Sequence, residues 1–196
     1  NLLGGYTSMP NPSLTEETSD NIEAGIRATP GRVSFGVTGF WNAYDGFIQQ
    51  VARGVNPATR LLEYQYQNVS RVAIRGIEAQ GDASLTATLR LRASYAFIRG
   101  SDVSGPVDVP LNSIAPNQIM LGLIHTATSN RWGTDFNLRG VAAQSTATAG
   151  TGLFAPPAYA VTDVFGWIAL SRDIVLRAGV TNLTNSKYFE WTNVRG

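Results

Sequence analysis

Few side chains in this sequence could carry out chemistry. Its 196 residues include one histidine, His125, and no cysteine, which excludes thiolate metal sites, cysteine nucleophiles and disulfides. The sequence contains no nucleophile elbow, phosphate-binding loop, HExxH motif or paired metal-ligand motif. His125 falls near the end of an expected strand, where we expect a structural or interfacial role. We therefore expect neither a catalytic residue nor a metal site, and a protein that is not an enzyme.

The composition excludes further classes of partner. The net charge is +1 and only 15% of the residues are charged, compared with about a quarter in an average soluble domain. Nucleic acid is therefore not an expected partner. The chain has no uninterrupted apolar run of roughly 18 residues, which a transmembrane helix would need.

The elements that must position any functional side chain are β-strands. Across 89–97, apolar side chains alternate with Arg90, Arg92 and Ser94, and the same period of two recurs along the chain. We expect about eight strands, roughly at 18–28, 33–49, 63–80, 85–99, 117–128, 132–143, 158–170 and 174–183. Several are long enough to cross a bilayer at a tilt, which takes about 9–11 residues.

Short and long connections alternate between these strands. The expected tight turns are 29–32, 81–84, 129–131 and 171–173, and the long connections are 50–62, 100–116 and 144–157. Outer-membrane barrels have short periplasmic turns and longer extracellular loops. The pattern predicts an all-β fold, an antiparallel meander of about eight long strands that is part of a large transmembrane β-barrel. A soluble β-sandwich that acts as a binding module is the alternative.

The positions of the two chain ends suggest an incomplete barrel. With the long loops outside, residues 1–17 and 184–196 both lie on the extracellular side. A bacterial barrel that folds alone has both ends in the periplasm. We therefore expect 1–196 to be a partial barrel, with at least one strand missing at each end.

Three stretches, taken in chain order, resemble motifs of a known family. They contain Asn11, Pro12, Leu14, Glu17, Glu23 and Gly25 in the first, Asn68, Gly76 and Glu78 in the second, and Asn182, Leu183 and Tyr188 in the third. These are similar to the NPxLxxE…xExG, N…GxE and NLxxxxY motifs of TonB-dependent outer-membrane receptors. The tail 188–196 most resembles the haemoglobin and haem branch of that family.

The resemblance implies a receptor in the bacterial outer membrane. Its barrel would have about 22 strands around a separate N-terminal plug, and this chain would lack the plug and the last strand. The receptor would take up haem or a haemoprotein with energy from the TonB complex, which acts through the N-terminal region. A ferric siderophore or another nutrient is the alternative cargo. Outer-membrane lipid would be a further partner, and no covalent cofactor is expected.

The resemblance also suggests residues that contact the ligand. Haem receptors of this kind carry an iron-binding histidine in the loop before the NPxL motif, but 1–9 contains none. Tyr6 and Met9 are the candidate ligand-binding residues there. A tyrosine oxygen can hold ferric iron, although Tyr6 can also be an aromatic of the barrel rim.

Two further groups of side chains have expected positions in the barrel. One group falls toward the expected strand ends and suits aromatic girdles: Trp41, Tyr44, Phe47, Tyr64, Tyr66, Trp132 and Trp167. The other falls on the polar strand faces and would line the lumen: Arg90, Arg92, Asp135, Arg139 and Arg177. Gly76 interrupts the alternation of its strand, as a β-bulge would.

Overall fold

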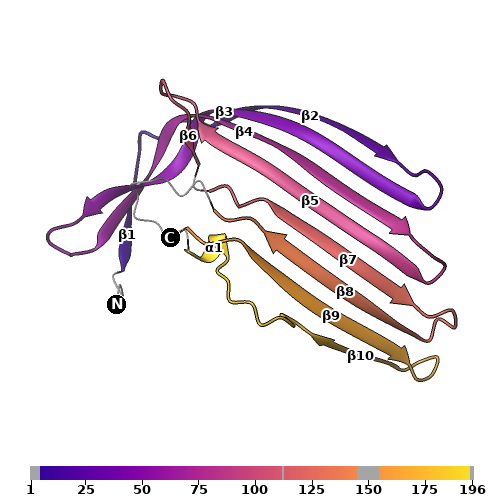
Figure 1. Ribbon diagram of the computed structural model, residues 1–196. Helices are drawn as coiled ribbons and strands as arrows, with labels where there is room; N and C mark the ends of the chain where they lie inside the picture. The colour runs from indigo at the N-terminus through magenta and orange to yellow at the C-terminus, as the bar shows by residue number, and fades with distance from the viewer. Residues whose placement is uncertain (1–4, 112, 145–154, 195–196) are drawn as a thin grey trace. The chain divides into compact units, whose positions relative to one another are not determined.

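The computed structural model describes residues 5–111, 113–144 and 155–194 (Figure 1). Its strands are β1 (Tyr6–Met9), β2 (Thr18–Ala28), β3 (Val33–Val55), β4 (Leu62–Ser84), β5 (Leu89–Asp102), β6 (Val109–Pro110), β7 (Gln118–Thr126), β8 (Trp132–Val141), β9 (Tyr159–Ala169) and β10 (Val175–Val180), and a short helix α1 spans Trp191–Val194. Among the described residues, no helix is long and apolar enough to span a membrane.

The chain divides into two compact units. Unit 1 comprises Asn1–Ile22, Trp41–Ile74 and Gly100–Pro110, and unit 2 comprises Glu23–Phe40, Arg75–Arg99 and Leu111–Gly196. Strands β2 to β5 contribute residues to both units. In unit 1, β1 pairs in parallel with β4, and β6 pairs antiparallel with the end of β5.

Unit 2 is an antiparallel meander. Its strands lie side by side in the order β2, β3, β4, β5, β7, β8, β9 and β10 (Figure 1). The turns that follow β2, β4, β7 and β9 lie together at one end of this sheet. Two of these turns use left-handed residues, Gly31 (φ 60°) and Asn130 (φ 53°), as tight polar turns require. The prediction of a largely antiparallel all-β chain with about eight long strands is confirmed.

The largest differences from the expected boundaries involve β3 and β4. Residues 50–62 were expected to form a long loop, but β3 continues to Val55 and β4 begins at Leu62. The connection is a compact turn in which the Asn56 side chain accepts hydrogen bonds from the Ala58 and Thr59 backbone N–H groups at 2.8 and 3.2 Å. The short β1 and β6 were not expected at all. The strict alternation of short and long connections is therefore broken at this turn.

The turn expected at 81–84 lies four residues further along the chain. Residues 81–84 belong to β4, and the turn is made by 85–88. The Thr86 hydroxyl accepts hydrogen bonds from the N–H groups of Thr88 and Leu89 at 3.2 and 3.0 Å. The Thr86 hydroxyl therefore stabilises the turn at 85–88, whereas the sequence Gly81-Asp82 had favoured a turn four residues earlier.

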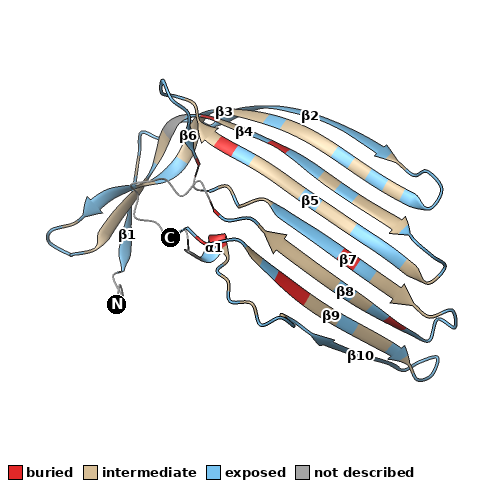
Figure 2. Ribbon diagram, in the orientation of Figure 1, coloured by how far each residue is buried: buried red, intermediate tan, exposed pale blue. Residues whose placement is uncertain are grey.

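One face of the unit 2 sheet is apolar and uncovered by protein. The paired registers place Leu91, Leu123, Phe136, Val164 and Val180 in one row across five strands. The outermost of these side chains, Val180, is 55% exposed, whereas the buried hydrophobic residues of the described chain are few (Figure 2). A continuous exposed apolar face marks a surface that meets lipid or another apolar partner. The opposite face carries the charged residues described below.

Candidate functional site

A hydrogen-bonded clasp in unit 1 fixes the first family motif. The Asn68 side chain accepts a hydrogen bond from Thr15 N–H at 2.9 Å, and its Nδ2 donates to the carbonyls of Thr15 and Gly46 at 3.1 and 2.7 Å. The Asn11 Nδ2 donates to the Tyr66 carbonyl at 2.8 Å. Residues 10–17, with their bonds to β3 and β4, are called the clasp segment below.

Other residues of the motif shape the same segment. The Asn11 carbonyl accepts the Leu14 N–H at 3.3 Å, which closes a turn around Pro12. The Glu17 Oε2 accepts the Ile48 N–H at 2.9 Å. Gly46 has a left-handed φ of 67°, and a Cβ at this position would lie 3.1 Å from the Glu16 carbonyl oxygen. These motif residues therefore hold backbone in place rather than supply reactive groups.

The clasp segment follows the strand that carries the two candidate ligand residues. In β1, Tyr6 lies opposite Leu62 and Met9 opposite Gln65. The Tyr6 side chain is 69% exposed and meets the Tyr64 ring edge-on, with 5.9 Å between the ring centroids. Immediately after β1, the Gln65 Nε2 donates to the Pro10 carbonyl at 2.9 Å. Tyr6 and Met9 are thus exposed on a strand anchored to β4, a role for β1 that the sequence did not indicate.

The second motif continues from Asn68 in unit 1 to Gly76 and Glu78 in unit 2, where Gly76 permits a close approach. A Cβ on Gly76 would lie 2.6 Å from the Phe40 Cζ and 2.6 Å from the Phe97 carbonyl oxygen. Gly76 lies within the continuous strand β4, and the contact with Phe40 and Phe97 accounts for this glycine. Two positions further on, Glu78 lines a hollow of about 420 Å³ on the polar face, together with Gln80 and Gln118.

The last residues of the first motif lie in β2, where a Cβ on Gly25 would be 2.9 Å from the Thr38 hydroxyl and Glu23 is exposed.

The third motif turns the chain back toward β9. Asn182 (φ 51°) donates its N–H to Asp163 Oδ1 at 2.7 Å, and the Leu183 N–H donates to the Thr162 carbonyl at 2.7 Å. The Asn182 side chain accepts from Ser186 N–H at 2.8 Å and donates to its carbonyl at 3.0 Å. This pattern explains why an asparagine ends the strand. The alternation pattern did not identify Asp163 as its partner.

Tyr188 of this motif joins an aromatic and charged cluster. Its ring stacks on that of Tyr159 at 4.6 Å between centroids and 19° between planes. The Arg139 guanidinium lies 5.5 Å from the Tyr159 centroid and 5.7 Å from the Tyr188 centroid, and its Nη2 donates to Glu190 Oε1 at 2.7 Å. The hydrogen bond from Arg139 lowers the pKa of the Glu190 carboxyl below its ordinary value of 4.5.

This lowered pKa predicts an acid-sensitive contact. A carboxyl whose pKa is lower in the folded state stabilises the fold above its unfolded pKa, and this contribution is lost as the pH falls through the folded pKa. We expect Glu190→Gln to lower the thermal midpoint of the folded protein slightly at pH 7. The difference should disappear as the pH falls below 4.5 and through the lowered pKa of Glu190. Thermal unfolding followed across this range measures it, and a difference that stays constant with pH would contradict the assignment to Glu190.

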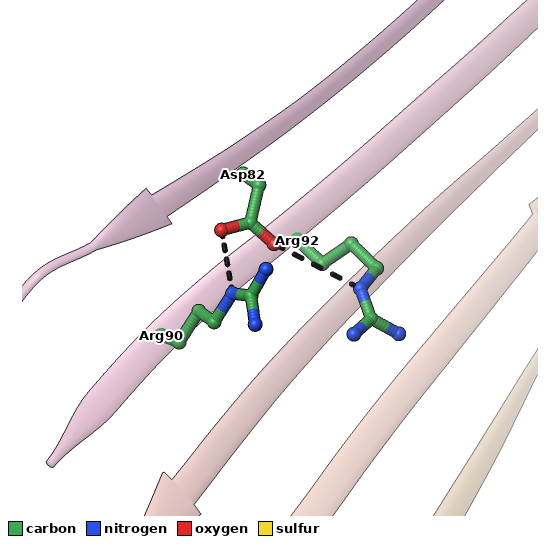
Figure 3. A network of polar contacts seen from close by, with 3 residues as sticks. All are labelled: Asp82, Arg90 and Arg92. Carbon is green, nitrogen blue, oxygen red and sulfur yellow. Dashed lines mark hydrogen bonds and ion pairs between the residues drawn. The ribbon is translucent and has the colours of Figure 1, made fainter. Parts of the chain in front are cut away.

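The polar face of unit 2 carries further ion pairs. Asp82 Oδ1 accepts from Arg90 Nε at 2.5 Å, and its Oδ2 lies 4.0 Å from Arg92 Nε (Figure 3). The register places Arg90 and Asp135 in one row, with Ile124 between them. Asp135 Oδ1 is buried and has no hydrogen-bond partner among the described residues. Arg139 and Arg177 lie on this same face, so the five residues expected on the polar side share it.

The expected aromatic girdle is only partly supported. Trp132 lies on the apolar face next to a tight turn, where its ring is 4.8 Å from that of His125. This contact agrees with a structural role for His125. Trp167 instead lies on the polar face, where a Cβ on the opposite residue, Gly133, would be 2.7 Å from the Trp167 Nε1. Tyr64 and Tyr66 lie near the start of β4, as expected, but the extension of β3 to Val55 leaves Trp41, Tyr44 and Phe47 inside that strand.

The polar side chains of the motifs described above hold backbone in place. No cluster of three or more histidine or acidic side chains in the described ranges could hold a metal ion. The structure presents two exposed candidate ligand-binding residues, Tyr6 and Met9, next to the clasp segment. It also presents a sheet face in unit 2 that carries charged side chains.

The chain is similar over nearly its whole length to known bacterial receptors. It is 26% identical to a hemoglobin-haptoglobin utilization protein B of Neisseria meningitidis serogroup C, over 94% of this chain and 27% of that protein. It is 25% identical to a hemoglobin and hemoglobin-haptoglobin-binding protein A of Haemophilus influenzae, over 97% of this chain and 20% of that protein. The chain thus spans about a quarter of the length of these relatives or less.

Solved structures share the fold. The copper transporter OprC superposes with a TM-score of 0.81 at 22% identity, over 91% of this chain and 27% of that one. The siderophore receptor PirA from Pseudomonas aeruginosa gives a TM-score of 0.71 at 21% identity, over 92% and 29% of the two chains. The family model described as TonB dependent receptor-like, beta-barrel matches residues 1–183. The chain therefore belongs to the TonB-dependent receptor β-barrel family, whose members lie in the outer membrane of Gram-negative bacteria.

Proposed function

We propose that the protein containing this chain is a receptor for TonB-energised uptake of haem from haemoglobin or a related haemoprotein. One observation carries the proposal. The relatives named for haemoglobin and haemoglobin–haptoglobin match at least 94% of the length of this chain. The solved structures named for copper and siderophores support the fold alone, because they are at most 22% identical.

The division of roles follows from the two faces of the sheet. The apolar face meets outer-membrane lipid, where hydrogen bonds between neighbouring strands pair the backbone groups. The polar face lines the lumen, where an N-terminal plug is the proposed neighbour. The barrel wall performs no chemistry on its cargo. Exposed residues at the end of the strands opposite the tight turns, called the long-connection end, select the ligand. In this proposal 1–196 is a partial barrel, and the TonB complex acts through a region upstream of it.

Tyr6 provides the most direct test of ligand contact. We expect cells that display the full-length protein to bind haemoglobin saturably, and Tyr6→Ala to weaken binding about tenfold, as loss of an exposed aromatic anchor does. Tyr6→Phe separates two roles. It should abolish a Soret shift on haem binding if the phenolate oxygen holds iron, and it should leave binding nearly unchanged if the ring alone makes contact.

The controls use a tyrosine on the other face and a second cargo. Tyr95→Ala removes a tyrosine from the apolar face of β5, where it lies opposite Ile119, and should leave haemoglobin binding unchanged. Ferric enterobactin, offered in parallel, represents the siderophore alternative. Binding of the siderophore without any binding of haem or haemoglobin would overturn the proposed cargo and leave the receptor class intact.

A further inference from the structure

The chain beyond β10 is attached to unit 2 at two separate points. Residues 182–194 are called the exit segment. Its first attachment is the Asn182 turn on Asp163 and Thr162, described above. The second is the cluster of Arg139, Tyr159, Tyr188 and Glu190, six to eight residues further along the segment.

One side chain, Arg139, contacts every other member of the second attachment. Arg139 contacts three partners at once, since it donates to Glu190 Oε1 at 2.7 Å and lies over both stacked rings at 5.5 and 5.7 Å. Two of these partners, Tyr188 and Glu190, belong to the exit segment, and Tyr159 belongs to β9. A planar guanidinium suits this arrangement because it can pair with a carboxylate and stack on aromatic rings. Lysine could not make all of these contacts.

The attachment leaves part of the exit segment facing outward. Trp191 is buried at 4% exposure, whereas Phe189, two residues before it, is 55% exposed. Lys187 is also exposed. The alternation of anchored and exposed residues gives the segment a fixed orientation, with an aromatic and a basic side chain on its outer side.

We propose that Arg139 is a positioning residue that fixes the exit segment at the long-connection end of β8 and β9, so that Phe189 and Lys187 form part of the surface that binds a haemoprotein. This inference rests on the proposed function for the identity of the ligand. A segment ordered before binding loses less conformational entropy when the ligand docks, so its contribution to affinity depends on the anchor. Arg139 itself remains on the polar face and makes no contact with the ligand.

Trypsin provides a readout that requires no ligand. The Lys187–Tyr188 bond lies between the two attachments, and trypsin added to intact cells reaches only surface-exposed sites. In Arg139→Gln we expect cleavage after Lys187 at least tenfold faster than in the parent protein, and haemoglobin binding about five- to tenfold weaker. Arg139→Lys keeps the charge without the planar group and should give an intermediate cleavage rate. Glu190→Gln should give a cleavage rate similar to that of Arg139→Lys.

The matched control is Arg177→Gln. Arg177 lies on the same polar face but pairs in register with Trp167, near the tight-turn end of β10. Its substitution removes the same charge and should leave both the cleavage after Lys187 and haemoglobin binding as in the parent. Equal amounts of folded barrel in all variants are established by heat-dependent mobility in gels.

The two readouts separate the failure of this inference from failure of the proposed function. Unchanged cleavage in Arg139→Gln would overturn the positioning role. Faster cleavage with unchanged haemoglobin binding would overturn the contribution of Phe189 and Lys187 to the binding surface. If the parent protein binds no haemoglobin, the proposed cargo is wrong, but the cleavage rates still decide whether Arg139 holds the exit segment. Faster cleavage together with weaker binding supports the inference in full.

Discussion

Gly76→Val should prevent this barrel wall from folding. A Cβ at residue 76 would lie 2.6 Å from the Phe40 Cζ and 2.6 Å from the Phe97 carbonyl oxygen. The Phe40 ring could rotate away, but the Phe97 oxygen belongs to the backbone of the neighbouring β5 and cannot move without disturbing strand pairing. Overpacking commonly costs about 1–3 kcal/mol where side chains can adjust, and a clash with backbone should exceed this range. We expect little or no folded receptor in the outer membrane.

The strand itself supplies the matched control. A Cβ on Gly81, also in β4, would have the Ser34 carbonyl oxygen as its nearest contact at 3.6 Å, an ordinary distance. Gly81→Val should therefore leave most of the protein folded, as judged by heat-dependent mobility in gels and by surface labelling. Combining Gly76→Val with Phe40→Ala should fail to restore folding, because the Phe97 oxygen remains. Restoration by Phe40→Ala would show that the ring alone required the glycine.

The period of two in the sequence predicted most of the strands because each has one polar and one apolar face. The pattern fails where the faces differ less. Residues 50–55 contain Gly54 with a φ of 111° and no clear alternation, so the extension of β3 resembled a loop. At 81–84, the sequence Gly-Asp suggested a turn. In the structure Asp82 points toward Arg90 and Arg92, a pairing that local turn chemistry does not reveal.

The candidate site was less accessible to prediction because its bonds join distant parts of the chain. Asn68 bonds to Thr15, 53 residues away, and Arg139 bonds to Glu190, 51 residues away. Neither separation produces a periodic pattern. The family resemblance identified several of the same residues, Asn11 and Glu17 among them, without indicating what they contact. It also left Arg139 and Glu190 unconnected, because one was expected on the lumen face and the other in the tail.

Asn68→Ala should release the clasp segment and weaken ligand binding about tenfold. The substitution removes three hydrogen bonds, to Thr15 N–H, the Thr15 carbonyl and the Gly46 carbonyl. Hydrogen bonds of this kind contribute about 1 kcal/mol each, and less where water can replace the lost partner. A net loss of about 1.4 kcal/mol corresponds to tenfold in affinity. The effect on Tyr6 and Met9 is indirect, through the anchoring of β1.

Hydrogen–deuterium exchange distinguishes release of the clasp segment from a general loss of stability. In Asn68→Ala, the Thr15 N–H loses its acceptor, so exchange should accelerate in peptides covering 10–17 and remain slow in β7 and β8. Gln50→Ala is the matched control, because it removes an exposed amide side chain from β3 without touching the clasp. Asn68→Asp keeps the acceptor for Thr15 N–H but places a carboxylate against two carbonyl oxygens, so it should be no better than alanine. If exchange in 10–17 is unchanged while haemoglobin binding falls, Asn68 acts on the ligand by another route and the clasp is not what orders Tyr6.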